Sequence, residues 1–246
     1  MTSVPSPPQL WCDAVQAEQL KADTEHAQVS GHDLVTYRLL TLRRLPTLLA
    51  DAEIRMRIRE DGLAGWLESG AFETFHSVGY TAGLADRTVR IEVEHGVLGV
   101  PADASPCDRP IYGYVHGSAD ELSSRITDYG KILVRLDDGL RQRATVTLGD
   151  SMGSTNRGNW ACMSPEPLEQ PVLLCRFANR DVVSAGNLVD ACDPYYGYAE
   201  VQIYGPLYPH DIREVVFCYG VPATDTLRNR LANWEIPFYE SNGDPE

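Results

Sequence analysis

The sequence predicts an α+β protein in which a mainly helical N-terminal part, residues 1–99, precedes a β-rich core, residues 100–246. Three observations support this fold class. Of the 246 residues, 43% are hydrophobic and 23% charged, as in an ordinary globular protein with one sizeable core. Helical spacing dominates up to residue 60, and strand-like alternation dominates after residue 108. Because few helices separate the predicted strands, a mixed or antiparallel sheet is favoured over a doubly wound parallel one.

The N-terminal part shows helical spacing in two stretches, residues 10–28 and about 33–60. Pro46 should break or kink the second stretch, so two helices fit it better than one. Its arginines, which fill the gaps between the leucines, suggest either a nucleic-acid surface or, as we favour, a solvated helix face paired with nearby acids. Residues 62–99, dense in glycine and aromatic residues, are typical of short helices, turns and loops.

A connector rich in Pro, Asp and Cys, residues 100–108, marks the expected boundary between the two parts, although one continuous domain is the alternative. Beyond it, alternation of β-branched and aromatic residues predicts six strands. These lie at residues 109–115, 131–136, 144–149, 171–177, 198–205 and 214–220. Short helices are expected at residues 119–127, 138–143 and 224–233.

The charge balance disfavours a general nucleic-acid-binding surface, because 35 acids against 21 bases give a net charge of −14. Residues 1–33 carry −4 and residues 187–246 carry −7, so the middle of the chain, at −3, repels an anionic ligand least. No run of about 18 apolar residues indicates a membrane span, and the N-terminus lacks a secretory signal. We therefore expect the protein to be cytoplasmic, with delivery into a target cell by a dedicated secretion machine as the alternative.

The six cysteines and six histidines show no metal-ligand spacing, so isolated reduced thiols and no metal site are expected. The phosphate-loop, dinucleotide-binding, zinc-protease and serine-hydrolase motifs are absent from the sequence. The segment VHGS, residues 115–118, suggests a nucleotide-binding element or, as we prefer, a turn after a strand.

Residues 198–205 form the most informative predicted strand. Alternation places Ala199, Val201 and Ile203 on one face and a carboxylate, a carboxamide and two phenols on the other. The polar face consists of Tyr198, Glu200, Gln202 and Tyr204. Such a face either meets bulk water or lines a cleft, and the pattern alone leaves both open.

Two other segments offer polar side chains. Thr145 and Thr147 share one face of a predicted strand that ends in the Gly149–Ser151 turn, a common structural feature. Arg109 begins another predicted strand, where it could clamp a phosphate or carboxylate or, equally, pair with Asp108.

Six blocks over roughly residues 60–220 together resemble a little-characterised bacterial and phage-associated family. The blocks are FETFHSVGYTAG, DRTVRIEVEHGVLG, RPIYGYV, DYGKILVRL, RATVTLGDS and YAEVQIYGPLYPHDIREV. Members of that family resemble mono-ADP-ribosyltransferase toxin domains. The resemblance implies an ADP-ribosyltransferase-like core, NAD as co-substrate without a metal, and transfer of ADP-ribose to an unknown protein or nucleic acid. A toxin or anti-phage effector of this kind would pair with an antitoxin or immunity protein, and no membrane partner is expected.

The same resemblance assigns roles to individual residues. Glu200 would be the catalytic glutamate, which stabilises the oxocarbenium-like ribose formed as nicotinamide leaves. Arg109 would hold an NAD phosphate or ribose oxygen, and Tyr112 would stack on nicotinamide. The remaining cofactor-binding residues would be Thr147, Gly149, Ser151 and Gln202.

Two features depart from the family pattern. Phe75 stands where the family has a glycine, and Glu200 precedes Gln202, whereas transferases with an E-x-E or Q-x-E pair place the catalytic glutamate second. The alternative functions are an NAD glycohydrolase, in which water is the acceptor, and a non-catalytic interaction module of the same fold. A nucleic-acid binder acting through the arginines of residues 38–59 is a further alternative.

Overall fold

The computed structural model describes residues 47–50, 52–72, 74–78, 87–98, 100–115, 126, 128–147, 149–152, 160–162, 173–174 and 198–243. The expected helix at residues 10–28, the VHGS segment beyond Val115 and most of the expected helix at 119–127 lie outside these ranges.

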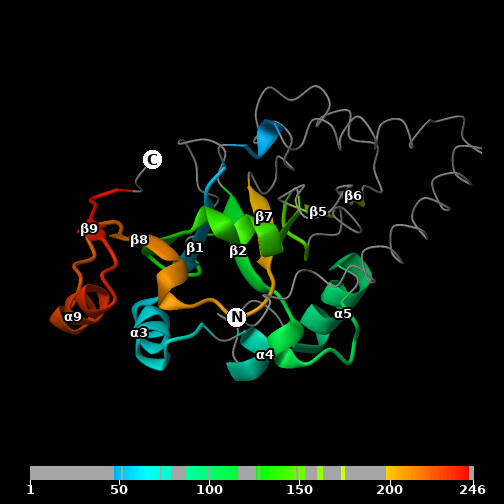
Figure 1. Ribbon diagram of the computed structural model, residues 1–246, viewed down its shortest axis with the longest axis horizontal. Coiled ribbons are helices and arrows are strands. Elements are labelled where there is room, and N and C mark those ends of the chain that lie inside the picture. Colours follow the sequence, from blue (N-terminus) through cyan, green and yellow to red (C-terminus); the bar gives the residue numbers. More distant parts are fainter. Residues whose placement is uncertain are drawn as a thin grey trace, which may run out of the picture.

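Nine strands in the described ranges form one sheet, in the order β6-β5-β4-β7-β2-β1-β3-β8-β9 (Figure 1). The strands are β1 (Ile54–Ile58), β2 (Ile111–Val115), β3 (Ile132–Leu136), β4 (Ala144–Thr147), β5 (Trp160–Cys162), β6 (Leu173–Leu174), β7 (Ala199–Ile203), β8 (Ile212–Phe217) and β9 (Phe238–Glu240). All neighbouring pairs are antiparallel except β8 and β9, which run parallel. The sheet is therefore mixed and mainly antiparallel, which confirms the predicted α+β class.

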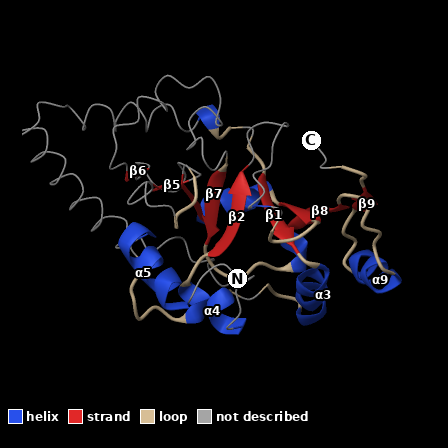
Figure 2. Ribbon diagram, turned by 180° about the vertical axis from the view of Figure 1, so that it is seen from behind, coloured by secondary structure: helices blue, strands red, loops and turns tan. Residues whose placement is uncertain are grey.

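The helices of the described ranges are α3 (Glu60–Ser69), α4 (Phe75–Val78), α5 (Arg87–Leu98) and α9 (Asp225–Asn233), with short 3-10 helices at Pro106–Asp108, Asp138–Arg143 and Pro209–Asp211. Figures 1 and 2 show α3 and α9 beside the β1–β8–β9 end of the sheet, and α4 and α5 toward the other end. None of these helices is both long and apolar enough to cross a membrane.

Strand β1 corrects the expected helix at residues 33–60, because residues 54–58 are a strand at the centre of the sheet that pairs with β2 and β3. In the segment IRMRI, the apolar residues Ile54, Met56 and Ile58 join the core, and Arg55 and Arg57 occupy the other face. This period of two was hidden by leucines at helical spacing just before it. The helical prediction is wrong at residues 54–58, and its part before residue 47 lies outside the described ranges.

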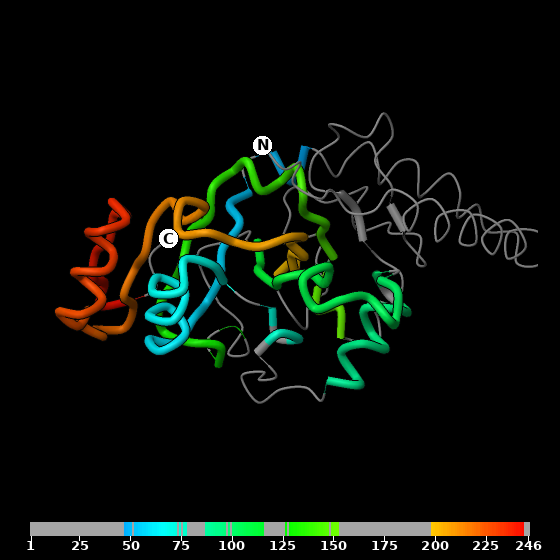
Figure 3. The backbone as a smooth tube through the Cα atoms, turned by 60° about the horizontal axis from the view of Figure 1, so that its bottom comes forward, coloured from blue at the N-terminus to red at the C-terminus, as the bar shows by residue number. Residues whose placement is uncertain are grey.

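The hydrophobic core lies on the face of the sheet that carries the β1 apolar residues. Helix α3 contributes Leu63, Trp66 and Leu67 to it, and helix α9 contributes Leu227 and Leu231. Although these helices are far apart in sequence, they lie side by side, as the cyan and red segments of Figure 3 show. The opposite face of the central strands carries Glu200 and Gln202 together with a second buried cluster that includes Tyr114 and Tyr198.

The predicted strands at residues 109–115, 131–136, 144–149, 198–205 and 214–220 are confirmed by β2, β3, β4, β7 and β8. The predicted helix at 224–233 is confirmed by α9, and residues 138–143 form a 3-10 helix. Strands β1, β5 and β9 were not anticipated, and of the expected strand at 171–177 the structure describes β6. Because β1 pairs with β2 and β3, strand pairing joins both sides of the boundary expected near residue 100, and the division into two parts stays a prediction.

Candidate active site

A cavity of about 640 Å³ lies between helix α3, helix α5 and strands β1, β2 and β7. Apolar side chains such as Trp66 and Phe72 line one part of it. Polar and aromatic side chains line another part, namely Arg57, Arg59, Arg90, Tyr112, Tyr129, Tyr198 and Glu200. Its volume lies within the range of roughly 300–1,000 Å³ typical of small-molecule sites.

Glu200 reaches this cavity from the middle of β7, a strand that lies between β2 and β4. Its neighbours across the sheet are Tyr114 on β2 and Thr147 on β4. The side chain is 7% exposed, and Tyr198 on the same strand also lines the cavity, so the polar face of β7 is buried and does not meet bulk water.

Burial raises the pKa of Glu200 to about 7, since a charged carboxylate loses its hydration there. Arg90 opposes this effect, Asp150 adds to it through repulsion of a second carboxylate, and the side chains of Ser151 and Gln202 favour the charged form. A carboxyl group with a pKa near neutrality can both hold charge and exchange a proton at physiological pH.

A network of buried side chains fixes Glu200 from behind. Gln202 Nε2 donates to Glu200 Oε1 at 2.8 Å and to Thr147 Oγ1 at 3.1 Å, and Thr145 Oγ1 donates to Gln202 Oε1 at 2.9 Å. Gln202, Thr145 and Thr147 are each 0% exposed. These contacts leave Glu200 one preferred orientation toward the cavity.

The turn after β4 completes this support. The carbonyl oxygen of Gly149 accepts from the Glu200 backbone N–H at 3.3 Å and from Thr147 Oγ1 at 3.0 Å. Gly149 has φ 112°, a backbone conformation that side-chain-bearing residues rarely adopt. Ser151 Oγ is buried and makes no hydrogen bond of standard geometry with a described residue, although it lies near enough to Glu200 to lower that pKa. Thr147, Gly149, Ser151 and Gln202 thus gather around Glu200 but do not line the cavity.

Arg90, on helix α5, is the functional candidate that sequence reasoning missed. Its guanidinium carbon lies 4.3 Å from the centroid of the Tyr112 ring, a cation–π contact. Burial alone would lower the pKa of Arg90, but Tyr112 and Glu200 raise it above its ordinary value. Nη1 of Arg90 is buried without a hydrogen-bond partner in the described part of the chain. The candidate site therefore combines a buried carboxylate with a buried cation.

Arg109 lies elsewhere. It is 2% exposed, and its Nη1 donates to Glu94 Oε2 at 2.6 Å. Its other guanidinium nitrogens donate to the backbone carbonyls of Pro101, Ala102 and Ala104. Its carboxylate partner is thus Glu94 and not Asp108, and Arg109 does not line the cavity. The phosphate-binding role expected of Arg109 has no geometric support.

Tyr112 lines the cavity; the Arg90 guanidinium packs on its ring, and its hydroxyl donates to Glu94 Oε1 at 2.9 Å. Its stacking on nicotinamide stays a prediction. Burial raises the pKa of Tyr112 well above its ordinary value, and burial likewise raises the pKa values of Tyr129 and Tyr198. The cavity is therefore lined by neutral phenols. No group of three or more His, Cys, Asp or Glu side chains suited to a metal ion occurs in the described ranges.

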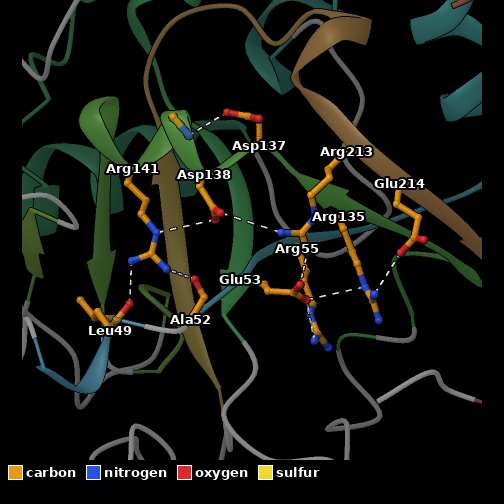
Figure 4. Close-up of polar contacts among 11 residues, drawn as sticks. Leu49, Ala52, Glu53, Arg55, Arg135, Asp137, Asp138, Arg141, Arg213 and Glu214 are labelled. Carbon is orange, nitrogen blue, oxygen red and sulfur yellow. Dashed lines mark hydrogen bonds and ion pairs between the residues drawn. The ribbon is translucent and has the colours of Figure 1, made fainter. Parts of the chain in front are cut away.

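The arginines of the β1–β3–β8 region are paired with acids (Figure 4). Glu53 contacts Arg55, Arg135 and Arg213, and burial, which raises the pKa of Glu53, is outweighed by these arginines, which lower it. Other pairs are Arg135 with Glu214 and Arg213 with Asp138. Arg55 pairs with Glu53 as predicted, but it lies on strand β1 with its side chain 15% exposed, so the expected solvated helix face is wrong at this residue. Arg38, Arg43 and Arg44 lie outside the described ranges.

No protein-family model matches the chain. It is similar to the gene 2 protein of Mycobacterium phage L5, with 26% identity over 237 residues, covering 92% of this chain and 84% of that protein. Among solved structures it is similar to DarT of Thermus sp. 2.9 in complex with carba-NAD+ and with NAD+, at 15% identity in each case. These alignments cover 77% of this chain and 94% and 95% of the other chains, with TM-scores of 0.41 and 0.42. The chain thus has a sequence relative in a mycobacteriophage.

Proposed function

We propose that this chain is an NAD-dependent mono-ADP-ribosyltransferase whose active site is the cavity around Glu200. The observation that carries the proposal is the presence, at one cavity, of a buried carboxylate with a pKa near 7 and of the Arg90 guanidinium, whose Nη1 is buried and whose charge acts on Glu200. NAD has the complementary chemistry, because its ribose becomes cationic when nicotinamide leaves and its two phosphates are anionic.

The reaction breaks the bond between the anomeric carbon of the ribose and the nicotinamide nitrogen, and the electron pair leaves with nicotinamide. The ribose then resembles an oxocarbenium ion, as in glycoside hydrolysis. The charged form of Glu200 stabilises this cation, and the Gln202 and Thr147 hydrogen bonds hold the carboxylate in place beforehand. The acceptor's nucleophilic atom bonds to the anomeric carbon, and its proton passes to Glu200, whose pKa suits a general base.

The charge of the cavity suits an anionic dinucleotide. Three arginines, Arg57, Arg59 and Arg90, line it against two acids, Asp61 and Glu200, so its lining carries a net charge of +1 in a protein of net charge −14. A locally positive cavity attracts an anion that the whole protein would repel. We assign phosphate or ribose binding to Arg90, with Tyr112 supporting it, and the fixing of Glu200 to Thr147, Gly149, Ser151 and Gln202.

The proposed acceptor is a protein or nucleic acid, and the proposed biological role is that of a toxin or anti-phage effector, active in the cytoplasm of the producing or target cell and countered by an antitoxin or immunity protein. The phage relative is consistent with a role in phage–host conflict.

The experiment is to follow nicotinamide release from labelled NAD by the wild type, Glu200→Gln and a matched control, Glu214→Gln. Glu214 lies on the same sheet but pairs with Arg135 outside the cavity. Loss of the Glu200 charge should slow release roughly 10²–10³-fold, by analogy with removing one preorganised electrostatic group, and the control should keep the wild-type rate. Equal rates for wild type and Glu200→Gln would refute the proposal.

The fate of the label separates the alternatives. Label on a macromolecule supports the transferase, whereas label found solely as free ADP-ribose, with lysate acceptors present, identifies a glycohydrolase. If there is no turnover, thermal unfolding with NAD distinguishes a binding module, because a ligand at 100 times its Kd stabilises the fold by about 2.7 kcal/mol.

A further inference from the structure

Glu94, a buried carboxylate that the proposed reaction does not use, lies one helical turn after Arg90 on α5. It is 0% exposed and contacts three side chains from outside its helix. Arg109 Nη1 donates to its Oε2 at 2.6 Å, and Tyr112 Oη donates to its Oε1 at 2.9 Å. His76 Nε2 lies 3.0 Å from the same Oε1. Glu94 therefore joins helix α5 to α4, to β2 and to the segment that precedes β2.

The contact with Tyr112 connects Glu94 to the cavity. Tyr112 is fixed at its backbone by pairing with Gln202 in the sheet and at its hydroxyl by Glu94. Between these two points lies its ring, on which the Arg90 guanidinium packs at 4.3 Å. Because Arg90 Nη1 has no hydrogen-bond partner in the described part of the chain, the ring is the main described contact that places this cation.

We propose that Glu94 is a positioning residue for this site: by holding the Tyr112 hydroxyl, it keeps the ring under Arg90 and Arg90 beside Glu200. This inference rests on the proposed function for the role of the site. The contacts among Glu94, Tyr112 and Arg90 can be tested without NAD. The alternative is that Glu94 only stabilises the fold, as the buried partner of Arg109. The two roles predict different results, because a substitution at Glu94 raises the pKa of Glu200 only if Glu94 positions Arg90.

The pKa of Glu200 depends on where the Arg90 guanidinium lies. The groups that act on Glu200 are Arg90 on α5, Asp150 and Ser151 in the turn after β4, and Gln202 on its own strand; Tyr112, Tyr129 and Tyr198 face it as neutral phenols. Arg90 lowers the pKa of Glu200, so displacing Arg90 must raise it. Replacing Glu94 by a neutral residue without moving Arg90 cannot raise the pKa of Glu200, because it adds no negative charge and removes no positive charge near it. The sign of the change thus separates positioning from simple loss of charge.

The test uses Glu94→Gln and Tyr112→Phe, each made with and without Glu200→Gln. The free energy of unfolding is measured against pH, and the difference within each pair isolates the titration of Glu200. We expect the pH midpoint of the Glu200 titration to be roughly half to one unit higher in both variants than in the wild type, because a nearby opposite charge is partly lost. Leu231→Ala, in the core on α9, is the matched control, because it destabilises the fold far from the cavity and should leave the midpoint unchanged.

Midpoints that stay unchanged or fall in the folded variants would overturn the proposal. Should Glu94→Gln fail to fold, Tyr112→Phe decides alone, since it keeps both the carboxylate and the aromatic ring. The measurement needs no NAD, so it gives an answer even if the wild type shows no turnover, an outcome that would refute the proposed function but not the positioning. If turnover is present, the pH midpoint of nicotinamide release should rise in parallel.

Discussion

Replacing Glu200 by glutamine should stabilise the protein, and the gain should grow as the pH rises. Burial raises the pKa of this carboxyl from 4.5 to about 7. A group whose pKa is raised by folding contributes stability that is fully present below pH 4.5 and is lost as the pH rises through 7. Glutamine stays neutral throughout, and its carbonyl oxygen can still accept from Gln202 Nε2, so the variant avoids this loss.

The size of the effect follows from the same two values. At about 1.4 kcal/mol for each pH unit between 4.5 and 7, the gain is roughly 3 kcal/mol at pH 8 and roughly 1 kcal/mol at pH 5. A difference of this size is a large fraction of the total stability of a typical domain. Glu200 would therefore be kept at a cost to the fold, as is common for functional groups.

Denaturant unfolding of wild type and Glu200→Gln at pH 5, 6, 7 and 8 measures this gain directly. Glu214→Gln, which removes a carboxylate paired with Arg135 outside the cavity, should show no gain that grows with pH. A gain for Glu200→Gln that is equal at pH 5 and pH 8, or a loss that deepens with pH, would contradict the structural account of this carboxylate.

Three further predictions concern the same region. Because the proposed reaction uses charged Glu200, kcat/KM for nicotinamide release should rise about tenfold per pH unit below 7 and level off above it, which a pH–rate profile checks. Arg90→Gln should lower kcat/KM for NAD roughly 10²-fold, whereas a change smaller than about threefold would remove Arg90 from the site. Arg109→Met, which leaves Glu94 without its cation in the interior, should cost about 3–5 kcal/mol in the free energy of unfolding, measured with denaturant, and an unchanged stability would show that the pair is dispensable.

Local alternation was enough to locate much of the sheet. It also places Glu200 and Gln202 on one face of β7, as the structure shows through their mutual hydrogen bond. The pattern could not show whether that face meets water or a cavity, because this depends on helices that pack there from distant parts of the sequence. At residues 54–58 local alternation failed to identify a strand. A five-residue alternation next to a leucine-rich helical pattern is ambiguous until its partners β2 and β3 are known.

The arginines show why the site was predicted less well than the sheet. Arg109 stands directly before a strand that lines the cavity, but its long side chain reaches Glu94 and three carbonyl groups instead. Arg90 lies in helix α5, where apolar residues do not mark the inward face reliably, because Leu98 is buried but Val89 is 43% exposed. Only the tertiary contacts of α5 distinguish an arginine under which a tyrosine packs from one that meets solvent.

The pairing of strand β2 with strand β7 also has a consequence for how the chain folds. It brings Ile111 opposite Ile203 across about 90 residues of sequence. Pairings of this range are entropically costly to close and are typical of domains that fold in milliseconds to seconds. Arg90 and Glu200, about 110 residues apart, come to the same cavity only once pairings of this range have formed. Under the proposed function, a partly folded chain without the β2–β7 pairing lacks the carboxylate at the cavity, so nicotinamide release should not appear before that pairing forms.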